Sequence, residues 1–96
     1  QVNMANEEQK SGISLNDLNS FYSYCKNELS LNVIGLMCLP PINSDKKKYF
    51  DLLKEKSISL KLQDLSMGMS SDYKQAILSG STYLRLGETL FGERKI

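Results

Sequence analysis

An apolar run that stops at two prolines limits the folds open to this chain more than any other feature. Residues 32–39 read Asn-Val-Ile-Gly-Leu-Met-Cys-Leu and are followed by Pro40 and Pro41. A nearly continuous apolar run of this length is typical of a strand that is buried on both faces of a parallel sheet. Proline has no N–H with which to continue the hydrogen-bonded ladder. We therefore predict a buried parallel strand that ends before Pro40.

The segment before this run has the spacing of an amphipathic helix. Ser14 is a candidate N-cap, and Asp17 is the carboxylate that would complete a capping box. Residues 1–6 are expected to form a short extended segment. The apolar stripe that predicts one helical face consists of Leu15, Leu18, Phe21, Tyr22, Cys25 and Leu29.

The segments after the two prolines continue the alternation. Residues 62–69 predict a strand broken by Gly68, and residues 82–86 predict another strand. A helix is expected before the first of these strands. Its candidate N-cap is Ser44, and its inward residues would be Tyr49, Phe50 and Leu53.

A third, shorter helix is expected between these two strands. Ser70 or Ser71 would cap it, with the carboxylate of Asp72 in its first turn, where it suits the positive end of the helix dipole. Gly80 would end it in a left-handed conformation. The residues expected to face inward are Tyr73, Ala76 and Ile77.

The resulting order is β-α-β-α-β-α-β with a terminal turn of helix. Strands that alternate with helices in this way predict an α/β fold with a parallel sheet. Four parallel strands can form a doubly wound domain on their own. They can equally be half of an eight-stranded barrel, which typically has roughly 250 residues. Periodicity alone leaves both architectures open.

Composition excludes several classes of protein. The chain has 96 residues, of which 41% are hydrophobic and 24% charged, as in ordinary globular domains. Its net charge of +1 lacks the basic excess of a nucleic-acid binder, and the basic run at residues 46–48 is expected to be a solvated face. No stretch approaches the roughly 20 apolar residues of a membrane span. We therefore expect neither nucleic acid nor a membrane among its partners.

The potential metal ligands and nucleophiles are few. The chain has no histidine, and Cys25 and Cys38 lie 13 residues apart. This pattern matches none of the usual zinc sites, so no metal is expected. Two buried, reduced thiols indicate a cytoplasmic protein. The N-terminus carries no signal-peptide pattern and reads as the inside of a strand, so we expect the chain to be part of a longer protein.

Four stretches are more informative than the periodicity. They are residues 2–5 with 10–12, residues 35–41, residues 65–72, and residues 84–87 with 91–94. In this order and spacing they resemble the C-terminal half of the pyridoxal phosphate homeostasis proteins, over essentially the whole chain. The third stretch, Leu-Ser-Met-Gly-Met-Ser-Ser-Asp, and the fourth, Leu-Arg-Leu-Gly with Phe-Gly-Glu-Arg, are the most specific.

This resemblance implies a fold and a function. The fold is a single-domain (β/α)₈ barrel of the TIM type, akin to the N-terminal domain of alanine racemase, of which residues 1–96 would supply about strands 5 to 8. Such proteins bind pyridoxal 5′-phosphate, have no established catalytic turnover, and are thought to buffer or deliver this vitamin B6 cofactor. The family's Schiff-base lysine lies on the first strand, and no residue of this chain matches it. The implied partner is the missing N-terminal half of the barrel, or a second copy of the chain.

The candidate cofactor-binding residues lie where barrels bind phosphates, after the last two strands. Backbone N–H groups at a helix start bind anions, and a glycine lets the backbone approach closely. By likeness to the family, Arg85 would face the pyridine nitrogen. Lys10 is interpreted as a solvated loop residue rather than a phosphate contact. The candidate residues are Ser66, Met67, Gly68, Met69, Ser70, Arg85, Gly87, Glu88 and Asn3.

Simpler structural roles are open for several of these residues. Ser70 can be an N-cap only, Met67 and Met69 can be core residues, and Arg85 can be part of a surface ion pair. Two other functions also remain open. The chain could be part of a pyridoxal-phosphate-dependent amino-acid racemase, or an interaction module that has lost its ligand. Because half a barrel exposes strand edges and an apolar face, we predict that the chain alone dimerises, aggregates or needs its other half.

Overall fold

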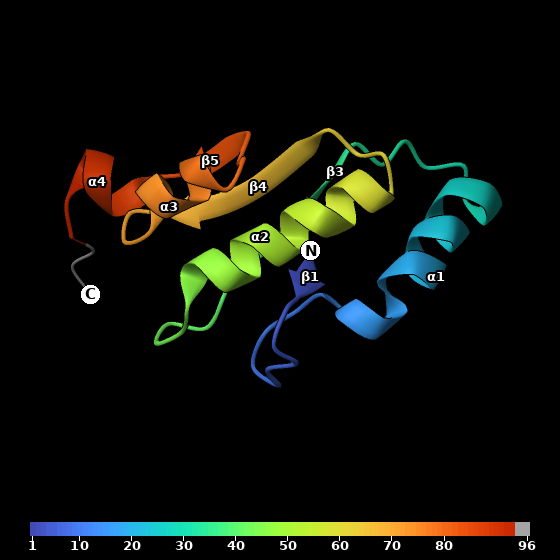
Figure 1. Cartoon of the computed structure of the whole chain (residues 1–96), viewed down its shortest axis with the longest axis horizontal. Coiled ribbons are helices and arrows are strands. Elements are labelled where there is room, and N and C mark those ends of the chain that lie inside the picture. Colours follow the sequence, from blue (N-terminus) through green and yellow to red (C-terminus); the bar gives the residue numbers. More distant parts are fainter. Residues whose placement is uncertain (94–96) are drawn as a thin grey trace.

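The computed structural model describes residues 1–93 and shows parallel strands that alternate with helices (Figure 1). The strands are β1 (Val2–Asn3), β2 (Ile13–Ser14), β3 (Gly35–Met37), β4 (Asp64–Met69) and β5 (Tyr83–Arg85). The α-helices are α1 (Leu18–Ser23), α2 (Lys46–Ser59), α3 (Tyr73–Leu78) and α4 (Gly87–Phe91). A 3₁₀ turn, η1 (Leu15–Asp17), and a π-helical turn, η2 (Tyr24–Glu28), flank α1. The predicted order of elements is confirmed, and β2 is an addition to it.

All the strand pairings among the described residues are parallel, as predicted. β4 lies between β3 and β5, with Leu36 opposite Leu65. The pairing of β4 with β5 is irregular between Ser66 and Met69. β1 pairs with β2, and a bridge between Val2 and Cys38 connects this pair to β3. The strands therefore follow one another as β2, β1, β3, β4 and β5.

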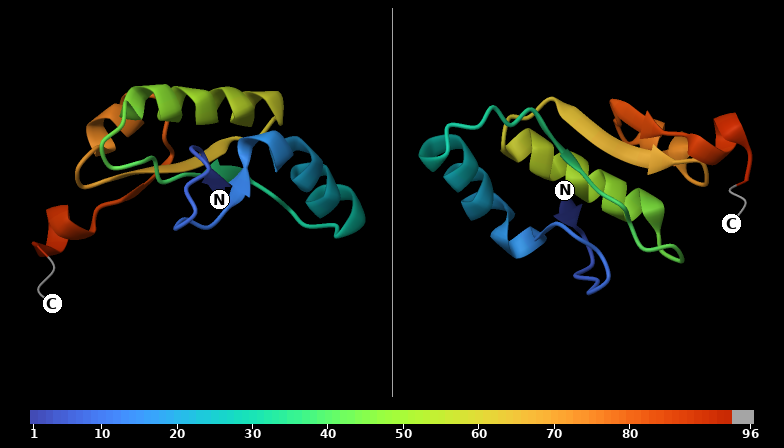
Figure 2. Two further views of the ribbon diagram at one scale, coloured as in Figure 1. Left: turned by 90° about the horizontal axis from the view of Figure 1, so that it is seen from below. Right: turned by 180° about the vertical axis from the view of Figure 1, so that it is seen from behind.

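The core lies between one face of this sheet and the helices α2 and α3. α2 runs along that face of β3 and β4 (Figure 2). Alternate strand residues point into it, because successive side chains of a strand face opposite sides. The side chains that meet in this core are Leu36, Cys38, Leu65 and Met67 from the strands, with Phe50, Leu53 and Ala76 from the helices.

The prediction that residues 32–39 are buried on both faces is wrong for the described chain. β3 covers only residues 35–37, and Leu36 on its inner face is 8% exposed. Ile34, just before β3, is 56% exposed, and on the face opposite to Leu36 the side chain of Tyr83, which pairs with Ser66, is 57% exposed. No helix of residues 1–93 covers this second face, so burial alternates along the strand.

The first predicted helix forms as η1, α1 and η2 in succession. Ser14 caps it as predicted, because its Oγ accepts a hydrogen bond from the N–H of Asp17 at 3.3 Å. The Ser14 hydroxyl itself donates to the Asp17 carboxylate at 3.0 Å. Of the predicted inward stripe, Leu18 and Cys25 are buried, whereas Phe21 is half exposed. The stripe therefore has a narrower buried face than the spacing indicated.

Two of the predicted N-caps are wrong by one or two residues. α2 is capped by Asp45, whose Oδ1 accepts from the N–H of Lys48 at 3.3 Å, and not by Ser44. α3 begins after Asp72, so neither Ser70 nor Ser71 caps it and Asp72 lies before its first turn. Gly80 ends α3 as predicted, with φ +102°. No helix within residues 1–93 is long and apolar enough to cross a membrane.

Candidate functional site

A hollow of about 770 Å³ lies at the carboxyl ends of β4 and β5. The turn between β4 and α3 forms one wall, and the start of α4 forms another. In a parallel sheet with helical crossovers, ligands bind outside the carboxyl ends of the strands. Five of the nine predicted site residues line this hollow, namely Met69, Ser70, Arg85, Gly87 and Glu88.

Ser70 joins the two walls of the hollow. Its Oγ accepts a hydrogen bond from the N–H of Thr89, in α4, at 2.9 Å. The hydroxyl proton of Ser70 remains free to donate to a ligand. The N–H groups of Gly87 and Glu88 begin α4, where a helix has no internal acceptors for them. These three groups give the hollow a set of hydrogen-bond donors suited to an anion.

Arg85 extends along the sheet from β5 towards β3. Its Nη2 donates to the carbonyl oxygen of Cys38 at 2.9 Å, and the carbonyl oxygen of Ser66 lies 3.5 Å from the same atom. Within residues 1–93 it forms no ion pair, so its suggested role in a surface ion pair is wrong. Its Nε is buried and has no partner among these residues. A buried donor without an acceptor is uncommon, and a ligand that accepts a hydrogen bond would satisfy it.

Gly68 and Met67 serve the core rather than the hollow. The Met67 side chain is fully buried against the helices, so only its backbone could contact a ligand. Gly68 has φ +105°, and a Cβ there would lie 2.6 Å from Cβ of Ala76 and 2.8 Å from Cδ2 of Leu84. The glycine is therefore needed for close packing against α3 and Leu84. The sequence suggested that a glycine here lets the backbone approach an anion, whereas the structure explains the glycine by packing.

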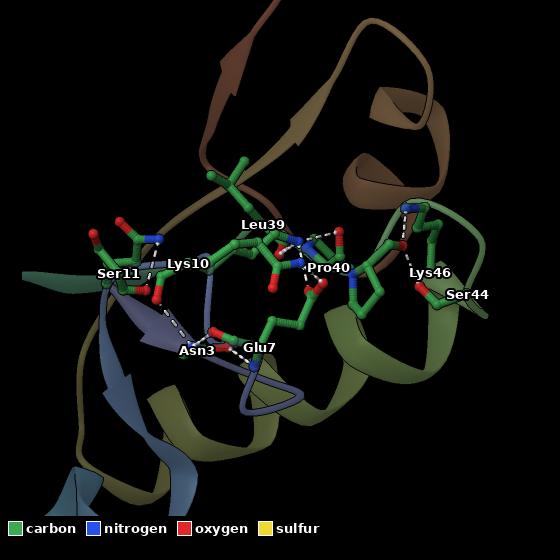
Figure 3. A network of polar contacts seen from close by, with 11 residues as sticks. Asn3, Glu7, Lys10, Ser11, Leu39, Pro40, Ser44 and Lys46 are labelled. Carbon is green, nitrogen blue, oxygen red and sulfur yellow. Dashed lines mark hydrogen bonds and ion pairs between the residues drawn. The ribbon is translucent and has the colours of Figure 1, made fainter.

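Asn3 and Ser66 lie away from the hollow. The side-chain amide of Asn3 donates to the carbonyl oxygens of Glu7 and Lys10, at 2.8 and 3.2 Å, and its Oδ1 accepts from the N–H of Glu7 (Figure 3). These bonds occupy the side chain within its own loop. Ser66 lines a separate hollow of about 210 Å³ on the open face of the sheet, beside Tyr83.

Three features near the hollow were not predicted from the sequence. Ile42 and Phe91 line it with exposed apolar side chains, although no periodic pattern includes Ile42. Lys10 is not solvated as expected. Its Nζ donates to the carbonyl oxygens of Leu39 and Pro40, and the side chain is 21% exposed. These contacts join residues about 30 positions apart, so no local signal could reveal them.

Cys38 is buried next to this site and has an unreactive thiol. Burial raises the pKa of its thiol to about 12, although the nearby positive charges of Arg85 and Lys10 act in the opposite direction. A buried thiol with a raised pKa is a poor nucleophile. Cys38 therefore acts as a core residue.

Comparison with known proteins identifies what the chain resembles. No family model matches it. It is 38% identical over 104 residues to the pyridoxal phosphate homeostasis protein of Aquifex aeolicus, covering 99% of this chain and 46% of that protein. It is 31% identical over 102 residues to the protein of the same name from Escherichia coli K12, covering 98% of this chain and 44% of that protein. The chain is a homologue of the pyridoxal phosphate homeostasis proteins. It spans just under half the length of these curated relatives.

Solved structures give the same result. The structure of PipY from Synechococcus elongatus without pyridoxal phosphate matches with a TM-score of 0.85 and 28% identity, over 96% of this chain and 47% of PipY. The structure of PipY with pyridoxal phosphate bound matches with a TM-score of 0.78 and 26% identity, over 92% of this chain and 46% of PipY. The predicted family resemblance and fold class are confirmed: the chain is α/β with parallel strands and has the fold of about half of a TIM-barrel-like protein. Its place as strands 5 to 8 stays a prediction. In the fourth stretch Arg94 lies outside the described residues.

Proposed function

We propose that this chain supplies the phosphate-binding region of a pyridoxal 5′-phosphate site, in a protein of intracellular vitamin B6 cofactor homeostasis. One observation supports this proposal above the others. The hollow at the ends of β4 and β5 is lined by five of the nine residues that the family resemblance singled out, and the homologous PipY has been solved with pyridoxal phosphate bound.

The donors in the hollow suit a phosphate group. The N–H groups of Gly87 and Glu88 and the hydroxyl of Ser70 can each donate to a phosphate oxygen. A Cβ placed on Gly87 would meet nothing within 4 Å, so the backbone is open to a ligand there. Phosphate is a dianion near neutral pH and is favoured by fixed N–H dipoles at a helix start. We assign these three residues to the phosphate.

The remaining lining suits an aromatic ring. Met69, Ile42 and Phe91 offer apolar surface, and the unpartnered Nε of Arg85 offers one donor. Arginine stays protonated and can only donate, so a ring nitrogen that faces it keeps its lone pair and stays unprotonated. When bound, the cofactor supplies an electron-withdrawing ring. An unprotonated ring nitrogen weakens that property, which suits a carrier or buffer better than an enzyme.

The chain's own residues support a role without catalysis. No lysine of the described chain lines the hollow, which supports the expectation that the family's Schiff-base lysine lies elsewhere. The sequence has no histidine, and the thiol of Cys38 has a pKa of about 12. We propose that this region holds the phosphate and that the lysine comes from another part of the protein. The two free, buried cysteines are consistent with a cytoplasmic location.

The open face of the sheet indicates a polypeptide partner. Tyr83 is more than half exposed on that face, and Ile34, just before β3, is also more than half exposed. Each of the outer strands β2 and β5 has one neighbour within residues 1–93. Unpaired edges and exposed apolar surface favour association. We propose that the rest of the barrel covers this face, and that the chain self-associates when that part is missing.

A comparison of two ligands tests the proposed function. Pyridoxal 5′-phosphate and pyridoxal, which lacks the phosphate, are titrated into the chain by calorimetry. Binding of the phosphorylated form only is expected, because the donors act on the phosphate. Borohydride reduction followed by mass spectrometry is expected to leave no covalent adduct. Equal binding of both ligands would refute the assignment of the phosphate site, and a stoichiometric adduct on one lysine would refute the proposal that the chain lacks such a lysine.

A further inference from the structure

The turn between β3 and α2 has fewer backbone N–H donors than an ordinary turn with which to form hydrogen bonds within itself. It contains Pro40 and Pro41, and proline has no backbone N–H. The carbonyl groups of this turn must therefore find donors elsewhere. Side chains supply these donors, and all of them except Ser44 belong to other elements of the chain.

Lys10 is the most extensively bonded of these donors. Its Nζ donates to the carbonyl oxygen of Leu39 at 2.8 Å and to that of Pro40 at 3.1 Å, and it forms an ion pair with Glu7 Oε1 at 2.7 Å (Figure 3). An ammonium group has three N–H donors, and here three acceptors surround it. Lys10 therefore has no donor left over for a ligand.

The loop that carries Lys10 is itself fixed. Asn3 donates to the carbonyl oxygens of Glu7 and Lys10 and accepts from the N–H of Glu7 at 3.0 Å. The side-chain amide thus joins both ends of the segment from residue 7 to residue 10. This arrangement holds the Lys10 backbone and the Glu7 carboxylate in place, so that Lys10 reaches the turn from a rigid base.

Three further hydrogen bonds support the turn on either side of the carbonyl groups that Lys10 binds. The carbonyl oxygen of Cys38, just before the turn, accepts from Arg85. The carbonyl oxygen of Pro41 accepts from Ser44 Oγ and from Lys46 Nζ. Four successive carbonyl groups, at residues 38–41, are thus held by side chains from the β1–β2 loop, from β5, from the start of α2, and from Ser44 of the turn itself.

The fixed turn leads directly into the wall of the candidate site. Ile42 follows Pro41 and lines both the hollow of about 770 Å³ and a neighbouring one of about 280 Å³. Its side chain is largely exposed, so little packing holds it in place. Its position depends on the turn that precedes it.

We propose that Lys10 is a positioning residue: it anchors the β3–α2 turn and so fixes the apolar wall that Ile42 presents to the ring of the cofactor. This inference rests on the proposed function for the identity of the ligand. In this proposal Lys10 affects the part of the site that contacts the ring, because it holds the turn before Ile42, and it does not contact the phosphate. Loss of Lys10 therefore lowers the affinity for a ligand that has the ring and leaves the affinity for phosphate alone unchanged.

The variant Lys10→Met tests this inference, with Lys47→Met as the matched control. Lys47 is exposed and pairs with Asp51 within α2, so the control removes the same charge away from the turn. In K10M the affinity for pyridoxal 5′-phosphate is expected to fall by about tenfold, the equivalent of one charged hydrogen bond. The affinity for inorganic phosphate is expected to stay at the wild-type value. The variant Lys10→Arg keeps donors for both carbonyl groups and is expected to restore most of the lost affinity.

Other outcomes distinguish competing explanations. If K10M weakens both ligands while the fold is intact, Lys10 acts on the phosphate and the inference is wrong. If K10M binds pyridoxal 5′-phosphate as tightly as K47M, the turn does not position the wall and the inference is again wrong. If the wild-type chain binds no pyridoxal 5′-phosphate, it is the proposed function that fails.

A measurement without ligand keeps the inference testable in that last case. Amide hydrogen exchange at Cys38, whose N–H donates to the carbonyl oxygen of Ser66 at 3.2 Å, is expected to be faster in K10M than in the wild type and unchanged in K47M, because this N–H lies directly before the carbonyl groups that Lys10 anchors. Unchanged exchange in K10M overturns the inference whatever the ligand does.

Discussion

The replacement of Gly68 by alanine is expected to destabilise this fold strongly. Gly68 lies in β4 with φ +105°, and an added Cβ would lie 2.6 Å from Cβ of Ala76 and 2.8 Å from Cδ2 of Leu84. The clash with Ala76 cannot be relieved without a shift of α3, whereas Cδ2 of Leu84 is the end of a flexible side chain that can rotate. The Ala76 methyl group is fixed to the α3 backbone and fully buried, and Leu84 packs against the same core.

Two separate costs determine the size of the effect. A residue with a Cβ in a left-handed conformation costs about 1 to 2 kcal/mol. Overpacking of a dense core by one methyl group costs about 1 to 3 kcal/mol. The free energy of unfolding is therefore expected to fall by about 2 to 5 kcal/mol, a large share of the roughly 5 to 15 kcal/mol that stabilises a typical domain.

Chemical denaturation followed by circular dichroism measures this change. Gly87→Ala is the matched control, because a Cβ at Gly87 meets nothing within 4 Å, and its stability is expected to stay within about 0.5 kcal/mol of the wild type. Equal midpoints for G68A and G87A would refute the interpretation that Gly68 is required by the packing of α3 and Leu84 against β4.

Three further predictions concern single side chains. Arg85→Met removes the hydrogen bond to Cys38 O and the buried Nε donor, so calorimetry is expected to show about tenfold weaker binding of pyridoxal 5′-phosphate; unchanged affinity contradicts the assigned role. Thr82→Val removes an Oγ1 that accepts from the N–H of Leu65 at 2.8 Å, and denaturation is expected to show a loss of about 1 to 3 kcal/mol, with Thr82→Ser as the variant that keeps the bond. The pKa of Cys38 is raised from 9.0 to about 12 by burial, so its neutral thiol contributes stability that is complete below pH 9.0 and is lost as the pH rises towards 12; a midpoint that falls no more steeply there than in Cys38→Ala contradicts this.

The spacing of apolar residues and the positions of glycine and proline predicted most of the fold. The apolar spacing placed Phe50 and Leu53 on the buried face of α2, and both are fully buried. Gly80 was expected to end α3 in a left-handed conformation, and it does. These features depend on neighbours within one or two helical turns, so the local sequence contains the necessary information.

The features that the sequence did not predict depend on contacts between distant residues, or on a choice between two neighbouring residues that suit the same role. β2 is two residues long and forms because it pairs with β1. The strand propensity of two residues is too weak a signal to predict it. Ser44 and Asp45 are adjacent and both suit an N-cap, and the structure uses Asp45. The exposure of Tyr83 depends on what covers the second face of the sheet, which no periodic pattern can specify.

The candidate site divides in the same way. The ends of β4 and β5 were predicted from the motifs around Ser70 and Arg85, and the structure brings them together at one hollow. The packing role of Gly68 and the anchoring contacts of Lys10 involve partners between 8 and 30 positions away. Only the folded chain reveals those two roles.

We propose that the carboxyl ends of β4 and β5 hold the phosphate of pyridoxal 5′-phosphate. A titration followed by ¹H–¹⁵N nuclear magnetic resonance can locate the ligand, because each backbone N–H reports separately. We expect the largest shifts at the amides of residues 70–71 and 87–88, with saturation at one equivalent of ligand. Shifts centred on the exposed Lys47 and Lys48, or no shifts in a folded chain, would contradict this assignment.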